Sequence, residues 1–178
     1  MITNQKSSFR KLCLKRLKEV SLQSKYIKNK IVIDNLNKVI KEKKANNILL
    51  YIPLKLEVDV QPLINSLRKA KKNVYVPFIQ GDSFKAVKYR LPLKQKKFGI
   101  KEPENSFLKT KKIDLAIVPI IGIDKLGKRI GFGKGMYDRF FYRLNYKPTT
   151  IFVQLILCKS EEILSDDYDI EADYIITG

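Results

Sequence analysis

The feature that most constrains the fold of this 178-residue chain is its alternation of short apolar runs with segments of helical spacing. The apolar runs are short, continuous and bounded by Pro or polar residues, which is typical of buried strands. The predicted strands are residues 48–52, 74–79, 84–89, 114–120, 149–157 and 174–177. Strands that alternate with helices predict an α/β fold with a mostly parallel sheet.

Helices are predicted over the first 45 residues, over 60–71 and from Met136 onward. Ser7 or Ser8 could cap the first helix, and Ser21 or Ser24 opens a second one. With no internal repeat and no composition break, we expect a single domain over residues 1–178. The expected architecture is a three-layer α/β/α domain with helices on both faces of the sheet and an N-terminal helical pair.

The net charge of +18, from 36 Lys and Arg against 18 Asp and Glu, raises the question of a polyanionic partner. Clustered cations bind nucleic-acid phosphates, but here they are spread from Lys6 to Lys159 without a known RNA-binding or zinc-finger motif. We favour a generally basic surface over dedicated nucleic-acid binding, and a basic site for small polyanions is a third interpretation.

Composition also excludes several chemistries. The chain has no histidine, so Ser-His dyads, Cys-His dyads and His-ligated zinc are excluded. Cys13 and Cys158 lie far apart in no CxxC pattern, so we expect reduced, inert thiols. The N-terminus lacks a secretory apolar region, and no apolar run approaches about 18 residues. We therefore expect a cytoplasmic protein without a membrane span.

The strongest local signal is Gly131-Phe-Gly-Lys-Gly-Met-Tyr-Asp-Arg139, at the end of the glycine-rich stretch 122–135 and the start of a predicted helix. Glycine lets the backbone approach a ligand and turn its N–H groups toward an anion. Lys134 and Arg139 add positive charge, and Asp138 could hold a magnesium ion that bridges phosphate oxygens. The pattern indicates a nucleotide phosphate site. The alternative is a flexible hairpin in which Asp138 only complements the helix dipole.

Two common phosphate-binding templates do not fit this stretch. A Walker A loop requires Ser or Thr after its lysine, where Gly135 stands. The dinucleotide fingerprint requires glycine where Met136 stands. The spacing by itself therefore predicts a glycine loop that leads into a helix and does not identify the nucleotide.

Motifs in a consistent order along residues 6–177 give the chain a resemblance to the 5-formyltetrahydrofolate cyclo-ligases, also called methenyltetrahydrofolate synthetases. The most specific are Gly99-Ile-Lys-Glu-Pro103, similar to the GIxEP loop, and Gly131-Phe-Gly-Lys-Gly-Met-Tyr-Asp-Arg139, similar to the GxGKGYYDR core. Weaker parts of the resemblance are residues 6–10, 56–59, 114–119 and 169–177. Met136, Tyr168 and Val60 depart from the usual Tyr, His and Thr.

The resemblance implies ATP- and Mg²⁺-dependent closure of 5-formyltetrahydrofolate to 5,10-methenyltetrahydrofolate, with release of ADP and phosphate. Phosphorylation of the formyl oxygen would turn it into a leaving group, and N10 would then attack the carbon. Such a reaction requires a phosphate cradle, a metal and a folate slot, but no histidine. We expect a monomeric enzyme whose partners are ATP and 5-formyltetrahydrofolate.

Carried over position by position, the resemblance implies three sets of site residues. The ATP site would consist of Lys6, Arg10, Arg129, Ile130, Gly131, Phe132, Gly133, Lys134, Gly135, Met136 and Tyr137. The folate site would consist of Ile52, Glu57, Phe132, Gly133, Lys134, Gly135 and Met136. Asp138 and Asp169 would hold Mg²⁺, and Lys134 and Arg139 would be catalytic, with Lys134 stabilising the transferring phosphoryl group.

Two other functions stay open on the sequence. One is an ATP-dependent enzyme that acts on another small carboxylate or carboxamide. The other is a basic RNA-binding module that has this fold without turnover, for which a steep salt dependence of binding is expected.

Tyr137 either stacks on a ligand ring or packs in the core, and Tyr51 and Phe98 are expected to be packing residues.

Overall fold

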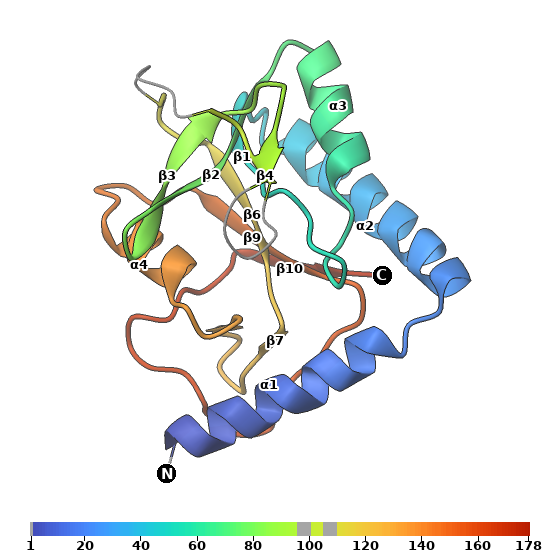
Figure 1. Cartoon of the computed structure of the whole chain (residues 1–178), viewed down its shortest axis with the longest axis vertical. Coiled ribbons are helices and arrows are strands. Elements are labelled where there is room, and N and C mark those ends of the chain that lie inside the picture. Colours follow the sequence, from blue (N-terminus) through green and yellow to red (C-terminus); the bar gives the residue numbers. More distant parts are fainter. Residues whose placement is uncertain (1, 96–100, 105–109) are drawn as a thin grey trace.

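The computed structural model describes residues 2–95, 101–104 and 110–178 (Figure 1). Its helices are α1 (Ile2–Lys18), α2 (Leu22–Glu42), α3 (Gln61–Lys69) and α4 (Met136–Tyr142). Its strands are β1 (Asn47–Leu49), β2 (Asn73–Gln80), β3 (Ser83–Lys88), β4 (Lys94–Gln95), β5 (Lys101–Glu102), β6 (Leu115–Pro119), β7 (Gly122–Ile123), β8 (Arg129–Ile130), β9 (Thr149–Gln154) and β10 (Tyr174–Thr177). Gly99, Ile100 and Phe98 lie outside the described residues.

A six-stranded sheet with the order β10-β9-β6-β1-β2-β3 forms the centre of the fold. All neighbouring pairs are parallel except β2 and β3, which form an antiparallel hairpin around the turn at Gly81. The parallel strands all end at the same edge of the sheet. Ligands of open α/β sheets bind beyond that carboxyl edge, so the topology places the ends of β1, β2 and β6 where a site is expected.

Helices cover both faces of the sheet, with α2 and α3 on one side and α4 on the other (Figure 1). Successive residues of a strand point to opposite faces. Accordingly, Ile48 and Leu50 pack into the core under α2 and α3, while Leu49 packs into the core that contains Phe140 of α4. The expected α/β class and the helices on both faces are confirmed.

Element ends differ from the sequence predictions at several points. Ser7 and Ser8 lie inside α1 and do not cap it, because the helix begins at Ile2. Ser21 does cap α2, and its hydroxyl accepts a hydrogen bond from the Ser24 N–H at 3.2 Å. Strand β9 stops at Gln154, short of the predicted end at 157. The buried Gln154 side chain bonds the Ile121 carbonyl and the Cys158 N–H, so it holds the chain in a turn there.

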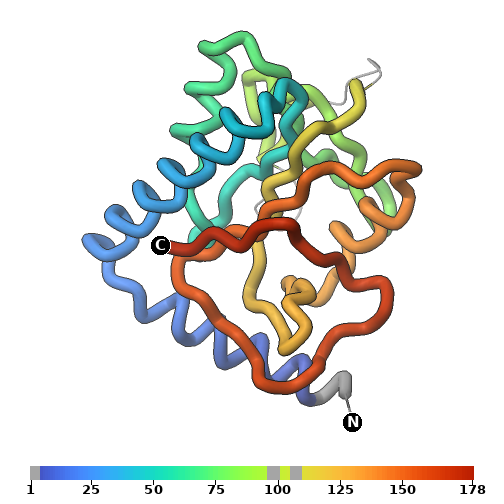
Figure 2. Tube along the Cα trace, turned by 180° about the vertical axis from the view of Figure 1, so that it is seen from behind, coloured from blue at the N-terminus to red at the C-terminus, as the bar shows by residue number. Residues whose placement is uncertain are grey.

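The expectation of reduced thiols is wrong, because Cys13 and Cys158 form a disulfide with a Cα–Cα distance of 5.8 Å. Helix α1 lies alongside the segment that follows β9, which brings the two side chains together (Figure 2). Both cysteines are fully buried. Their sequence separation of 145 residues gave no local sign of the pairing. None of the helices in the described part of the chain has the length and apolarity needed to span a membrane.

Candidate active site

A cavity of about 610 Å³ opens at the carboxyl edge of the sheet. The ends of β1, β2 and β6 form one side of it, and the loop 131–135 with the start of α4 forms the other. The predicted site residues that line it are Ile52, Glu57, Arg129, Phe132, Lys134, Gly135, Met136, Tyr137 and Arg139. These nine predicted residues thus surround one space, whereas Gly131 and Gly133 of the predicted loop do not line it.

The glycine stretch consists of two parts, a β7–β8 hairpin and the open loop 131–135 that leads into α4. A Cβ atom at Gly131 would collide with the guanidinium of Arg129. Gly135, which precedes α4, has φ +60°, a left-handed conformation that glycine adopts without strain. The glycines therefore allow close packing around Arg129 and a sharp entry into the helix.

Helix α1 places Arg10 against this loop. The Arg10 Nε–H donates to the Gly131 carbonyl at 2.9 Å, and the guanidinium would lie 3.5 Å from a Cβ built at Gly133. Gly133 itself does not line the cavity. Arg10 is therefore a cation held directly over the glycine loop, where the sequence predicted an ATP contact.

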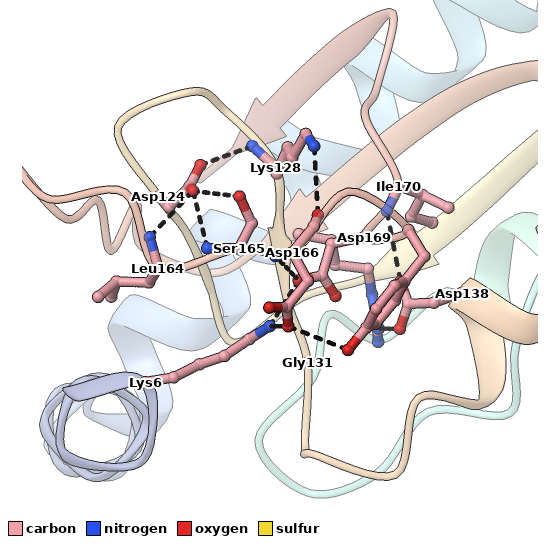
Figure 3. A network of polar contacts seen from close by, with 12 residues as sticks. Lys6, Asp124, Lys128, Gly131, Asp138, Leu164, Ser165, Asp166, Asp169 and Ile170 are labelled. Atoms are coloured by element: carbon pink, nitrogen blue, oxygen red, sulfur yellow. Dashed lines mark hydrogen bonds and ion pairs between the residues drawn. The ribbon is translucent and has the colours of Figure 1, made fainter. Parts of the chain in front are cut away.

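Lys6, one helical turn earlier, is buried and forms ion pairs with Asp169 and Asp166 (Figure 3). The same Asp169 oxygen accepts the Asp166 N–H at 2.8 Å. Burial lowers the pKa of Lys6, but its hydrogen bonds to and attraction by the two carboxylates outweigh that and raise the pKa above its usual value. Lys6 is therefore charged, and it anchors α1 to the segment before β10.

Asp138 and Asp169, the predicted magnesium ligands, are connected by a hydrogen bond between Asp138 and Ile170, the residue that follows Asp169 (Figure 3). The Ile170 N–H donates to Asp138 Oδ1 at 3.4 Å, and Arg129 Nη1 lies 3.5 Å from Asp138 Oδ2. Both aspartates are buried. Among the described residues, no three His, Cys, Asp or Glu side chains gather into a metal-binding group.

Two carboxylates nevertheless suit magnesium chemistry. Mg²⁺ commonly takes only one or two protein carboxylates and completes its shell with substrate phosphates and water. Within residues 2–95, 101–104 and 110–178, Asp138 makes contacts of 3.4 and 3.5 Å, and Asp169 accepts hydrogen bonds through one of its two oxygens. The donor set therefore fits a magnesium ion that is bound together with a phosphate group.

Glu57 lies just beyond β1 on the cavity wall, and its Oε2 accepts the Leu54 N–H at 2.8 Å. Burial raises the pKa of Glu57 to about 7, although the Leu54 hydrogen bond and the charge of Arg129 act in the opposite direction. A carboxyl group in this state gains strongly from a ligand that donates hydrogen bonds, because donors favour its charged form.

Arg129 and Tyr137 line the same cavity as Glu57. The Arg129 guanidinium lies 4.9 Å from the centre of the Tyr137 ring and donates to the Pro119 carbonyl. Tyr137 also packs edge-on against Phe84, with ring centres 4.9 Å apart. Tyr137 thus both lines the cavity and packs against the core.

Arg139, predicted to be catalytic, donates hydrogen bonds to two backbone carbonyl groups. Its Nε–H donates to the Asp82 carbonyl at 2.7 Å, and its Nη2 donates to the Lys134 carbonyl. It also forms an ion pair with the Asp82 carboxylate at 3.4 Å. These contacts tie the β2–β3 turn to the glycine loop, so Arg139 holds the loop that carries Lys134.

Ten cavity-lining residues were missed as site residues: Tyr51, Leu54, Pro77, Ile79, Gly81, Asp82, Phe84, Lys101, Glu102 and Pro119. Tyr51 was expected only to pack, and its hydroxyl indeed donates to the Val58 carbonyl at 2.9 Å. Glu102 belongs to the GIxEP resemblance, which was the available signal, but no role was assigned to it. Asp82 follows a turn glycine and gave no signal of its own.

A parallel sheet with a cationic loop and a cavity at its carboxyl edge is the arrangement of an α/β ligand-binding enzyme. The sequence profile of the 5-formyltetrahydrofolate cyclo-ligase family matches residues 2–178, so the chain belongs to this family. The resemblance and the enzyme class expected from the sequence motifs are thereby confirmed.

Curated relatives carry the same family name. The 5-formyltetrahydrofolate cyclo-ligase of Haemophilus influenzae is 35% identical over 109 residues, which are 57% of this chain and 58% of the relative. The chain thus spans less than two thirds of that relative. The enzyme of the same name from Mycoplasma genitalium is 27% identical over 175 residues, which are 96% of each chain.

Two solved structures share the fold. The 5,10-methenyltetrahydrofolate synthetase of Aquifex aeolicus has a TM-score of 0.81 and 31% identity, with 97% of this chain and 89% of that chain covered. The 5,10-methenyltetrahydrofolate synthetase of Mycoplasma pneumoniae has a TM-score of 0.78 and 24% identity, over 96% and 97% of the two chains. At that identity, the second similarity supports the fold alone.

Proposed function

We propose that this protein closes 5-formyltetrahydrofolate to 5,10-methenyltetrahydrofolate with consumption of ATP and release of ADP and phosphate. One observation carries the proposal: Glu57, several apolar side chains and Lys134 of the glycine loop all line the same cavity. Family membership supplies the substrate class. We further propose a monomeric protein located in the cytoplasm, although a disulfide is uncommon in that compartment.

The chemistry needs activation of an unreactive carbonyl. The formyl oxygen attacks the γ-phosphorus of ATP, and ADP leaves. N10 then attacks the formyl carbon to form a C–N bond, loses its proton, and the C–O bond breaks with departure of phosphate. Each step is promoted by stabilising negative charge on phosphate oxygens and by holding N10 against the carbon.

The cations around the glycine loop suit the phosphate part of this reaction. Lys134 lines the cavity, and Arg10 contacts the Gly131 carbonyl from outside it. We assign Lys134 to the transferring phosphoryl group and Arg10 to the remaining phosphates. Lys6 is held by Asp169 and Asp166, so its part is to position α1 and the aspartates, with phosphate contact only after rearrangement.

Asp138 and Asp169 would hold Mg²⁺ together with the ATP phosphates. The ion would supply Lewis-acid neutralisation of phosphate charge. Arg129 orients Asp138 through its 3.5 Å contact, and Lys6 orients Asp169. These two buried cations hold the carboxylates in place.

Glu57 suits the pterin end of the folate. The 2-amino group and N3–H of a pterin form a pair of adjacent donors, and a carboxylate accepts such a pair well. Ile52, Met136 and Phe132 line the same cavity and provide apolar contacts for the ring. Met136 offers a thioether where the family usually has tyrosine, so it packs without donating a hydrogen bond.

The test follows the absorbance of methenyltetrahydrofolate when purified protein is mixed with 5-formyltetrahydrofolate, ATP and Mg²⁺. We expect the band to grow with wild type, and to stay flat when ATP or Mg²⁺ is omitted. Lys134→Ala should lower kcat by about 100-fold or more, because it removes a charge that stabilises the transferring phosphoryl group.

The matched control is Lys125→Ala, which removes an exposed lysine in the turn between β7 and β8 and should keep wild-type turnover. A flat trace from folded wild-type protein would rule out the cyclo-ligase function. Equal loss in both lysine variants would show that Lys134 acts only through general charge. RNA binding with a steep salt dependence, without turnover, would favour the binding-module alternative.

A further inference from the structure

Glu102 is a second buried acid on the cavity wall, besides Glu57. It lies in β5, which pairs with β4 and packs against the end of β2. The residue is only 3% exposed, and it lines the cavity. Its Oε1 accepts the Ile79 N–H at 3.1 Å, which fixes the carboxylate at the carboxyl end of β2.

The second oxygen of Glu102 has no donor within the described part of the chain. Lys94 stands opposite Glu102 in the β4–β5 register, but its ion pair is with Glu104. A carboxylate that lines a cavity and accepts a single backbone hydrogen bond keeps acceptor capacity on its second oxygen. Its free oxygen is therefore an acceptor suited to a donor supplied by the occupant of the cavity.

The two acids lie on the wall of the same cavity. Glu57 follows β1, and Glu102 is fixed to the end of β2, which pairs with β1 in parallel. Two carboxylates on the wall of one cavity can accept hydrogen bonds from different donors of one bound ring. Cations line the cavity near the glycine loop, at Arg129, Lys134 and Arg139, and also at Lys101 beside Glu102.

A reduced pterin presents such donors. Its 2-amino group and N3–H lie side by side, and tetrahydropterins carry a further donor, N8–H, on the other side of the amino group beyond the acceptor N1. In a fully oxidised pterin, N8 instead carries a lone pair, which a carboxylate oxygen repels. An acceptor at this point favours the reduced ring by attraction and rejects the oxidised ring by repulsion.

We propose that Glu102 is a specificity-determining residue that accepts a hydrogen bond from N8–H of the bound tetrahydropterin and so selects reduced over oxidised folates. This role rests on the proposed function, since it presumes that the cavity holds the pterin ring. Glu57 then accepts hydrogen bonds from the 2-amino group and N3–H, and Glu102 discriminates between the reduced and the oxidised ring.

The experiment measures equilibrium binding, without ATP, of 5-formyltetrahydrofolate and of folic acid by isothermal titration calorimetry. Glu102→Gln keeps an oxygen for the Ile79 N–H but turns an amide donor toward the ligand. We expect it to weaken 5-formyltetrahydrofolate binding at least about tenfold, since it removes a charged acceptor, and to leave folic acid binding unchanged or tighter. Glu104→Gln, on the exposed partner of Lys94, is the control and should match wild type.

A second measurement needs no variant. Wild type should bind the 8-deaza analogue of 5-formyltetrahydrofolate, in which CH₂ replaces N8–H, about tenfold more weakly. Equal binding of the analogue, or equal loss of both folates in folded Glu102→Gln protein, would overturn the role of Glu102 while the proposed function stands. Failure of wild type to bind 5-formyltetrahydrofolate would overturn the proposed function and this role with it.

Discussion

Glu57 shows how a single side chain can be tuned by its surroundings. Its carboxyl group sits beside the apolar residues Tyr51 and Ile52, and burial raises its pKa to about 7. At neutral pH the empty site therefore holds a mixture of protonated and ionised Glu57. A donor-bearing ligand shifts that mixture to the ionised form, so ligand binding should release protons.

The raised pKa makes a prediction for stability. Between the usual pKa of 4.5 and about 7, the native protein binds more protons than the unfolded chain at this position, so stability is lost as pH rises through that window. Glu57→Gln removes this dependence. Its unfolding free energy relative to wild type should rise by at most about 3 kcal/mol from about pH 4.5 to about pH 8.

Urea unfolding of both proteins across this pH range measures the difference. Glu19→Gln, at an exposed acid after α1, should reproduce the wild-type pH profile. A difference between Glu57→Gln and wild type that stays constant with pH would contradict a raised pKa for Glu57.

At the scale of elements, helix α1 is attached at three points to distant parts of the chain around the site. It carries Lys6 to Asp169, Arg10 to the glycine loop and Cys13 to Cys158. These three attachments lie along one helix, and each joins it to a part of the chain more than 100 residues away. They hold Arg10 over the glycine loop and Lys6 against Asp169.

We predict that the double variant Cys13→Ala/Cys158→Ala is less stable by about 2–5 kcal/mol, because a disulfide that closes a long loop restricts the unfolded chain. A reductant should lower the unfolding free energy of wild type but not that of the double variant. Denaturant unfolding with and without dithiothreitol measures both effects. Two free thiols in unfolded, unreduced wild type would contradict the disulfide.

At the scale of the whole molecule, cations outnumber acids two to one, with 36 against 18. At least half of the cations therefore cannot pair one-to-one with an acid, so the excess positive charges on the surface repel one another. The positive potential also attracts polyanions such as ATP and glutamylated folates. The basic surface thus suits the proposed substrates at a cost in stability at low salt.

We expect the unfolding free energy to rise by roughly 1 kcal/mol between about 0.02 M and 0.3 M NaCl, since salt screens this repulsion. Urea unfolding at each salt concentration checks it. Sucrose at matched osmolality is the uncharged control and should not reproduce the full effect at these low concentrations. Constant or falling stability would show that attractive pairs dominate.

The sequence by itself determined the order and type of the main elements and the position of the glycine loop. Hydrophobic periodicity and glycine content are local properties, so they can be read along the chain. Element ends were less accurate, because side chains such as Gln154 decide them through contacts elsewhere. The family motifs identified Glu57, Lys134 and Asp138 but no role for Glu102.

Only the tertiary structure decided which distant residues meet. Lys6 and Asp169 are separated by 163 residues, and Cys13 and Cys158 by 145. Only the packing of β5 against β2 places Glu102 on the cavity wall, with one oxygen that has no donor among the described residues. Such pairings depend on how sheets and helices pack, which no local pattern encodes, and they determine the charge and hydrogen-bonding state of the site.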